Sequence, residues 1–181
     1  MPTNVSLSPD PQKNLSSRHL ALIGLTSICE KRITFDAAMA GLTLPATLSE
    51  RDRKFLHNMV YSTLRHYGQI TAIQKKMIAK PLAKNKRWVS NLISLSIAQL
   101  IYLKTPIHAV VATALAVLDD KHQPHFKPLV NGVLRTLARN PQAVATLIAN
   151  PKLNIPNWMQ QGWQQTIGKE VTAILPTLLE Q

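Results

Sequence analysis

The chain is poor in cysteine, glycine and acidic residues. Its one cysteine, Cys29, excludes an internal disulfide and a cysteine-based metal cluster, and it fits a reducing cytoplasm. Six glycines in 181 residues and few alternating β-branched residues favour helices over sheets.

The N-terminus lacks the basic and apolar regions of a signal peptide. The longest uncharged apolar run, residues 89–103, is too short and too polar to span a membrane. We therefore expect a cytoplasmic protein without membrane association.

Acidic residues are missing from the middle of the chain. The full sequence has 21 Lys and Arg residues against 9 Asp and Glu residues, which gives a net charge of +12. Between Arg53 and Leu118 there are ten basic residues and no acidic one, and residues 121–169 again lack acids. Solubility alone does not require the removal of every acid from the core helices. A field of one sign over such a length favours a polyanionic partner, and nucleic acid is the first candidate.

Capping residues and apolar spacing predict seven to nine helices and no strand. Residues 1–15 are rich in Pro, Ser and Asn and predict a loose tail. Ser16 or Ser17 can cap the first helix and Thr34 the second. Ser49-Glu-Arg-Asp52 resembles a capping box at the start of a long helix, which Gly68 can bend before Pro81 ends it. Residues 151–157 are typical of a linker. The expected helices cover residues 16–30, 35–40, 50–80, 88–103, 106–118, 128–140, a segment from 141, 158–167 and 170–179.

No pattern in the sequence predicts catalysis. Cys29 lies on the apolar stripe of the first helix, which is typical of an inert packed thiol. Neither a nucleophile elbow nor a glycine-rich phosphate loop is present. A loop over residues 119–125 contains two aspartates and two histidines (Asp119, Asp120, His122, His125), but Pro124 breaks the face that would aim the histidines at one metal ion. We expect no catalytic residue and no metal site.

Cations and one aromatic residue form the candidate RNA-binding face. The cations can neutralise phosphates, and Tyr61 lies among them and can stack on a base. Packing at the edge of the core is the alternative for Tyr61, and an ion pair with Asp52 is the alternative for Arg53. We interpret Asn131-Gly132 as a close contact between helices. The candidate RNA-binding residues are Arg51, Arg53, Lys54, Tyr61, Arg65, Lys80, Lys84, Lys86 and Arg87.

Several short sequence motifs in a fixed order identify a family resemblance over residues 18–139. They are Asp52-Arg-x-Phe55, Val60-Tyr-x-Thr-Leu-Arg65, Lys80-Pro-Leu82, Gln99-Leu-x-Tyr-Leu103, Pro106-x-His-Ala-x-Val111 and Leu129-Val-Asn-Gly-Val-Leu-Arg135. Together they resemble the NusB/RsmB family, and within it the N-terminal domain of the RsmB-type ribosomal RNA cytosine-C5 methyltransferases. The segment Ile155-Pro-Asn-Trp-Met159 is also similar to the stretch that leads to their catalytic part.

The resemblance implies an all-α, NusB-like fold of two packed helical bundles with a C-terminal helical extension. Together with the composition of the chain, it leads us to expect a tail (1–15), an RNA-binding helical domain (16–150) and a linker with short helices (151–181). The catalytic domain of such enzymes binds S-adenosylmethionine and uses two cysteines, one of them in a Pro-Cys motif. Cys29 follows Ile28 and does not match. We therefore expect the catalytic domain to be absent from this chain, and we expect no cofactor in it.

The sequence leads to three hypotheses about function. The first is a non-catalytic RNA-binding domain that positions ribosomal RNA for an RsmB-type methyltransferase domain. The second is a NusB-like transcription antitermination factor, with ribosomal and transcription proteins as partners. The third is a protein–protein scaffold whose charge is incidental.

Overall fold

The computed structural model describes residues 16–168, and these residues form helices and no strand. The prediction of an all-α fold is confirmed. None of the described helices is long and apolar enough to cross a membrane. The predicted tail 1–15 and the predicted helix 170–179 lie outside the described residues. The helices are α1 (Ser17–Lys31), α2 (Phe35–Ala40), α3 (Glu50–Arg65), α4 (Tyr67–Met77), α5 (Arg87–Ile101), α6 (Ile107–Asp120), α7 (Lys127–Arg139), α8 (Ala145–Ile148) and α9 (Asn157–Ile167), with short 3-10 turns η1 (Lys84–Lys86), η2 (Pro124–Phe126), η3 (Pro141–Val144) and η4 (Pro151–Asn154).

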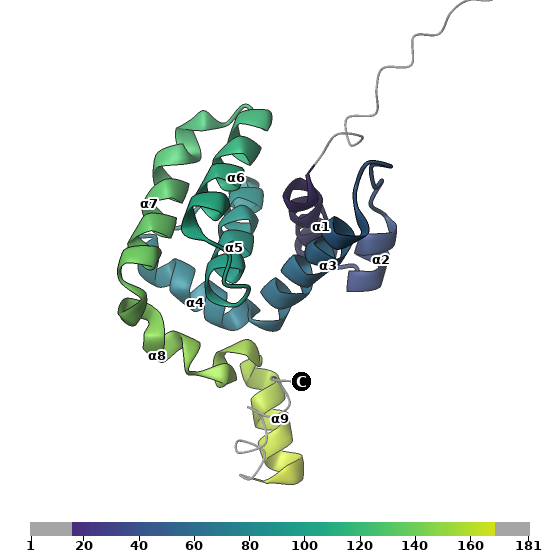
Figure 1. Cartoon of the computed structure of the whole chain (residues 1–181). Helices are drawn as coiled ribbons and strands as arrows, with labels where there is room; N and C mark the ends of the chain where they lie inside the picture. Colours follow the sequence, from purple (N-terminus) through teal and green to yellow (C-terminus); the bar gives the residue numbers. More distant parts are fainter. Residues whose placement is uncertain (1–15, 169–181) are drawn as a thin grey trace, which may run out of the picture.

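Helix α5 is the centre of the fold. It packs against α1 and α3 on one side and against α6 and α7 on the other, and it also contacts α4 (Figure 1). Every residue from 91 to 99 is buried, including several polar ones. Those polar groups have partners, as buried polar groups must: Gln74 Nε2 donates to Ser94 Oγ at 2.6 Å, and Ser96 donates to the Leu92 carbonyl at 2.8 Å.

Side-chain caps start the first three helices at the predicted residues. Ser16, Thr34 and Ser49 each accept a hydrogen bond from a backbone N–H in the first turn, which satisfies one of the free donors there. The predicted capping box at Ser49 is only half formed. Asp52 N–H donates to Ser49 Oγ at 3.1 Å, but the Asp52 carboxylate accepts from the Ser49 hydroxyl at 2.6 Å.

The long helix expected over residues 50–80 is two helices. α3 ends at Arg65 and α4 begins at Tyr67, so the break lies at His66 and not at Gly68. Gly68 has a different role, because the backbone of η4 passes directly over it. A Cβ atom on Gly68 would lie 1.7 Å from the carbonyl oxygen of Leu153. Glycine is therefore required here by close backbone approach.

Part of the predicted linker packs against α4 through Gln69. The Gln69 amide donates to the Ile148 carbonyl at 2.6 Å, and its Oε1 accepts from Asn154 Nδ2 at 2.9 Å and from the Tyr102 hydroxyl at 3.0 Å. The backbone N–H of Gln69 also donates to Asn154 Oδ1 at 2.9 Å. Ile155 is buried. The domain boundary at residue 150 stays a prediction, but residues 151–155 are attached to the helices before it.

The two aspartates at the end of α6 are not loop residues. The helix was expected to end at residue 118, but it continues through Asp120. Asp119 pairs with Lys127 at 2.6 Å and Asp120 with His19 at 2.7 Å, so they connect α6 to α7 and α1. At the start of α6, Pro106 is the capping residue and not the first helical residue as predicted.

The interpretation of Asn131-Gly132 as a close helix contact was wrong. Gly132 is exposed on α7, and nothing lies within 4 Å of the position its Cβ would take. Asn131 Oδ1 accepts a hydrogen bond from Arg135 Nε at 2.7 Å on the same helix. The pair therefore faces outward, because the buried stripe of α7 consists of other residues, namely Val130, Val133, Leu134 and Leu137.

Candidate nucleic-acid interface

The predicted RNA-binding residues form two groups on the surface. The first group lies along α3, and the second lies around the turn between α4 and α5. Most of these side chains are exposed, while Arg65 and Lys86 are half-buried. The first group consists of Arg51, Arg53, Lys54, Tyr61 and Arg65, and the second of Lys80, Lys84, Lys86 and Arg87.

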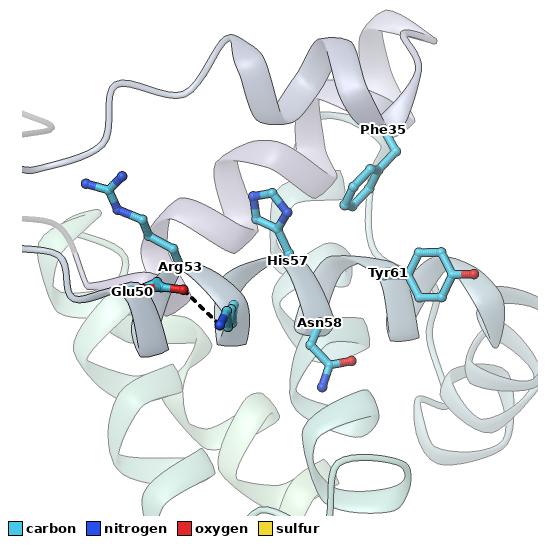
Figure 2. Close-up of a pocket in the computed structure, with 7 residues that line it drawn as sticks. Phe35, Glu50, Arg53, His57, Asn58 and Tyr61 are labelled. Carbon is cyan, nitrogen blue, oxygen red and sulfur yellow. Dashed lines mark ion pairs between the residues drawn. The ribbon is translucent and has the colours of Figure 1, made fainter.

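Three members of the first group, Arg53, Lys54 and Tyr61, line a hollow between α2 and α3, which we call the α2–α3 hollow. It has a volume of about 450 Å³, and its lining residues are Phe35, Glu50, Arg53, Lys54, His57, Asn58 and Tyr61. Figure 2 shows Phe35 reaching from α2 toward α3, with His57 and Tyr61 beside it and Arg53 nearer to Glu50. Because Arg53, His57 and Tyr61 follow one another at intervals of four residues, one face of α3 carries all three.

Three aromatic rings meet in this hollow. The Phe35 ring lies edge-on to His57, with ring centres 5.8 Å apart, and edge-on to Tyr61 at 6.2 Å. Tyr61 is 52% exposed, so it does not belong to the core. The Arg65 guanidinium lies over the Tyr61 ring, 5.7 Å from its centre, as in a cation–π contact. Tyr61 therefore lies at the edge of the packed helices with part of its side chain exposed, and base stacking on it stays a prediction.

The cations on α3 differ in how free they are. Lys54 pairs with Glu50 at 2.8 Å, and both side chains are largely exposed. Asp52 interacts with Arg18, and its carboxylate accepts from Ser49. Arg53 makes no ion pair with the residues the structure describes, so the alternative of an Arg53–Asp52 pair is not formed. Arg53 is left facing the α2–α3 hollow.

A second depression lies beside the first and shares Lys54 and Asn58 with it. Arg51 and Arg18 also line this depression. Arg18 lies over the Phe55 ring at 5.1 Å and donates from Nε to Gln99 at 3.0 Å. Burial lowers the pKa of Arg18, and the nearby Asp52 carboxylate opposes that shift. Arg18 is therefore held in place by the core, whereas Arg51 is exposed.

Two members of the second group, Lys84 and Arg87, line another hollow, between α4 and the start of α5. It has a volume of about 360 Å³, and Lys75, Lys84 and Arg87 line it together with Thr71, Gln74 and Ser90. Gln74 accepts from the Ser90 hydroxyl at 2.8 Å, which fixes the floor of the hollow. Lys80 is exposed in the loop between the two elements. The structure thus adds Lys75 to the predicted cations.

Lys86 differs from its neighbours because it faces the α6–α7 connection. Its Nζ donates to Gln123 Oε1 at 3.2 Å and lies 5.7 Å from the centre of the Phe126 ring. This cation therefore contributes to packing as well as to the charge of the surface.

Sequence reasoning missed Phe35, His57, Asn58 and Lys75. A signal for His57 was present, because it lies midway between Arg53 and Tyr61 at helical spacing. Phe35 could not be found in this way, because its contact with Tyr61 joins two helices across a loop whose path the sequence does not specify.

Nucleophile and metal candidates are not brought together in the described residues. Cys29 is half-buried beside Tyr67, and burial raises the pKa of its thiol, while the hydrogen bond from Tyr67 opposes that shift. Within residues 16–168, no three His, Cys, Asp or Glu side chains converge in a way that could hold a metal ion. Asp119 instead forms an ion pair with Lys127, and Asp120 contacts His19.

S-adenosylmethionine, which the resemblance implies for a separate domain, does not fit these residues. In open α/β folds such cofactors bind at the carboxyl ends of parallel strands, and residues 16–168 form no strand. The hollows are lined by cations, which would repel the positively charged sulfonium group of this cofactor.

These features define a basic, all-helical domain in which two sets of helices share one central helix. The model of the NusB family matches residues 15–139, so the chain belongs to the NusB family. The chain is also similar to proteins named ribosomal RNA small subunit methyltransferase B. It is 27% identical to that of Serratia proteamaculans over 156 residues and 28% identical to that of Klebsiella pneumoniae over 160 residues, in each case over 85% of the chain.

A third relative with the same name, from Sodalis glossinidius, is 34% identical over 122 residues and 65% of the chain. The matched part covers 36%, 37% and 28% of the three relatives. The chain therefore spans about a third of the length of these proteins. The predicted resemblance to the NusB/RsmB family is confirmed.

Proposed function

We propose that this chain is the RNA-binding, non-catalytic NusB-like part of an RsmB-type ribosomal RNA methyltransferase. The observation that carries the proposal is a pair of hollows whose cations, Arg53, Lys54, Lys75, Lys84 and Arg87, all come from the stretch 53–118, which has no acid. Arg53, Lys84 and Arg87 are exposed, which suits contact with a phosphate backbone. The names of the relatives support ribosomal RNA as the partner.

In this proposal the chain holds RNA and a separate domain performs the chemistry. That domain would bind S-adenosylmethionine and transfer its methyl group to a cytosine, while the hollows of this chain keep the RNA in register. A cytoplasmic location belongs to the same proposal, and the single cysteine agrees with a reducing compartment.

A salt titration of RNA binding tests the proposal. Affinity for a fragment of small-subunit ribosomal RNA, measured by fluorescence anisotropy, should fall linearly when log affinity is plotted against log salt concentration. Each neutralised phosphate adds roughly 0.7–0.9 to the slope. A slope near zero, or no binding at low salt, would overturn the proposal.

Charge reversal tests which surface is used. Replacement of Lys80, Lys84 and Arg87 by glutamate should weaken binding and reduce the magnitude of the slope by about 2, because up to three phosphate contacts are lost. Arg135, Arg139 and Lys152 are exposed elsewhere, so their replacement by glutamate changes the net charge by the same amount. Equal losses in the two triple variants would show that the binding depends only on net charge.

One observation on α9 supports the alternative scaffold hypothesis. Trp158 is 70% exposed and Ile167 is 58% exposed, and none of the residues of α9 is buried. Large apolar side chains on such a helix are typical of a protein contact. Pull-down with wild type and with Trp158→Ser distinguishes the partners. Recovery of a methyltransferase domain fits the proposal above. Recovery of ribosomal and transcription proteins alone favours the scaffold or antitermination hypothesis.

A further inference from the structure

We propose that the α2–α3 hollow binds one unpaired nucleobase of RNA, which stacks on Tyr61. This inference rests on the proposed RNA-binding function and specifies the kind of RNA that one of its surfaces takes. The occupant is a nucleotide in a single strand, loop or bulge, and not a base in a duplex.

The first argument is the availability of the Tyr61 ring. Tyr61 is 52% exposed, and the phenol makes no hydrogen bond with residues 16–168. Phe35 is half-buried against the core and meets Tyr61 edge-on at 6.2 Å, and Arg65 lies over the ring 5.7 Å from its centre; these two neighbours leave about half of the side chain exposed. A ring that is fixed in direction and still exposed is a suitable platform for a base.

The second argument is the charge around the ring. Arg65 lies 5.7 Å from the centre of the Tyr61 ring, and Arg53 lies on the same helix about 18 Å along the axis from Arg65. Neither arginine forms an ion pair with the described residues. Arg53 lines the hollow and Arg65 lies beyond Tyr61, so both can contact phosphates of a strand that runs along α3. The acid in the lining, Glu50, is paired with Lys54.

The third argument is the polar composition of the lining. His57 and Asn58 offer ring nitrogens and an amide, groups that hydrogen-bond to the edges of bases. A base whose partner strand hides those edges cannot use them, and a duplex is too wide for a hollow of about 450 Å³. Charge complementarity argues against a basic or neutral peptide as the occupant.

The test compares two RNA probes and four proteins. The probes are a labelled 12-nucleotide oligouridylate and a duplex of equal length. Tyr61→Leu keeps an apolar side chain but removes the stacking surface, so it should weaken binding to the single strand by about 5- to 100-fold and leave duplex binding unchanged. Tyr61→Phe keeps the ring and should stay within about twofold of wild type. Trp158→Leu removes an aromatic ring that is exposed on α9, outside the hollow, and should change neither affinity.

Several results would overturn the inference. They are an unchanged affinity of Tyr61→Leu for the single strand, an equal loss for both probes, and an equal loss in Trp158→Leu. A poly-glutamate peptide that competes with oligouridylate in wild type but not in Tyr61→Leu would identify an acidic peptide as the occupant instead. Suppose that wild type binds RNA, that the triple variant of Lys80, Lys84 and Arg87 binds RNA more weakly, and that Tyr61→Leu binds as tightly as wild type. In that case only this inference fails. If wild type binds no RNA, the proposed function fails.

Discussion

At the scale of single residues, two glycines in helices have opposite surroundings. Gly68 lies under the backbone of η4, where a Cβ atom has no space, whereas Gly132 on α7 faces open space. Glycine inside a helix costs stability because its unfolded backbone has the most freedom to lose. The contact at Gly68 explains its presence, while nothing within the described residues requires glycine at position 132.

Gly132→Ala should therefore stabilise the protein. Alanine adds no contact but reduces the freedom of the unfolded chain, so the free energy of unfolding should rise by about 0.5–1 kcal/mol. Urea denaturation followed by circular dichroism measures the change. A lower free energy of unfolding would show that the space around Gly132 is smaller than the structure indicates.

At the scale of elements, the attachment of η4 to α4 depends on contacts between distant parts of the chain. Gln69 and Asn154 are 85 residues apart and share two hydrogen bonds. His66 stacks on Tyr102 with ring centres 3.7 Å apart, and burial raises the pKa of Tyr102 to about 12. Tyr102 therefore remains protonated and donates to Gln69 at neutral pH. These contacts fix the path of the chain where it leaves the helices before residue 150.

Gly68→Ala should detach η4 from α4. The added Cβ would overlap the Leu153 carbonyl, and overpacking of this kind typically costs about 1–3 kcal/mol. Trypsin should then cleave faster after Lys152, which is exposed in η4. Gly162→Ala is the matched control, because its Cβ would meet nothing within 4 Å. Equal cleavage rates for Gly68→Ala and wild type would contradict this packing.

At the scale of the whole molecule, two partly buried histidines make stability depend on pH. Burial lowers the pKa of His19, with Asp120 opposing the shift. Burial also lowers the pKa of His66, with the hydrogen bond to Gln69 opposing it. The unfolded chain has ordinary histidines with pKa near 6.5. Below about pH 6.5 the unfolded state therefore binds more protons than the folded state, and acidification favours unfolding.

The free energy of unfolding should accordingly fall between pH 7.5 and pH 5.5. Urea titrations at both values measure it. His66→Phe keeps a ring on Tyr102 but removes one titrating group, so the difference between the two pH values should shrink. His108 is exposed on α6, and His108→Phe should leave the difference as in wild type. A stability that stays constant or rises on acidification would contradict the burial of both histidines.

The sequence predicted the features that depend on neighbouring residues. The caps at Ser16, Thr34 and Ser49 and most helix positions were correct, because capping and apolar spacing act within one or two turns. The break at His66 and the packing over Gly68 were missed, since contacts with η4 and Tyr102 decide them. In the candidate interface the exposed cations were predictable from charge, whereas the Phe35–Tyr61 contact depends on tertiary structure.

The shared position of α5 has a consequence for how the molecule can come apart. Since α1 and α3 pack on one side of this helix and α6 and α7 on the other, loss of either set would leave a row of apolar side chains in water. Each such side chain costs roughly 1.5–3 kcal/mol when exposed. The two sets are therefore not independent folding units, and we expect residues 16–139 to melt in a single cooperative transition.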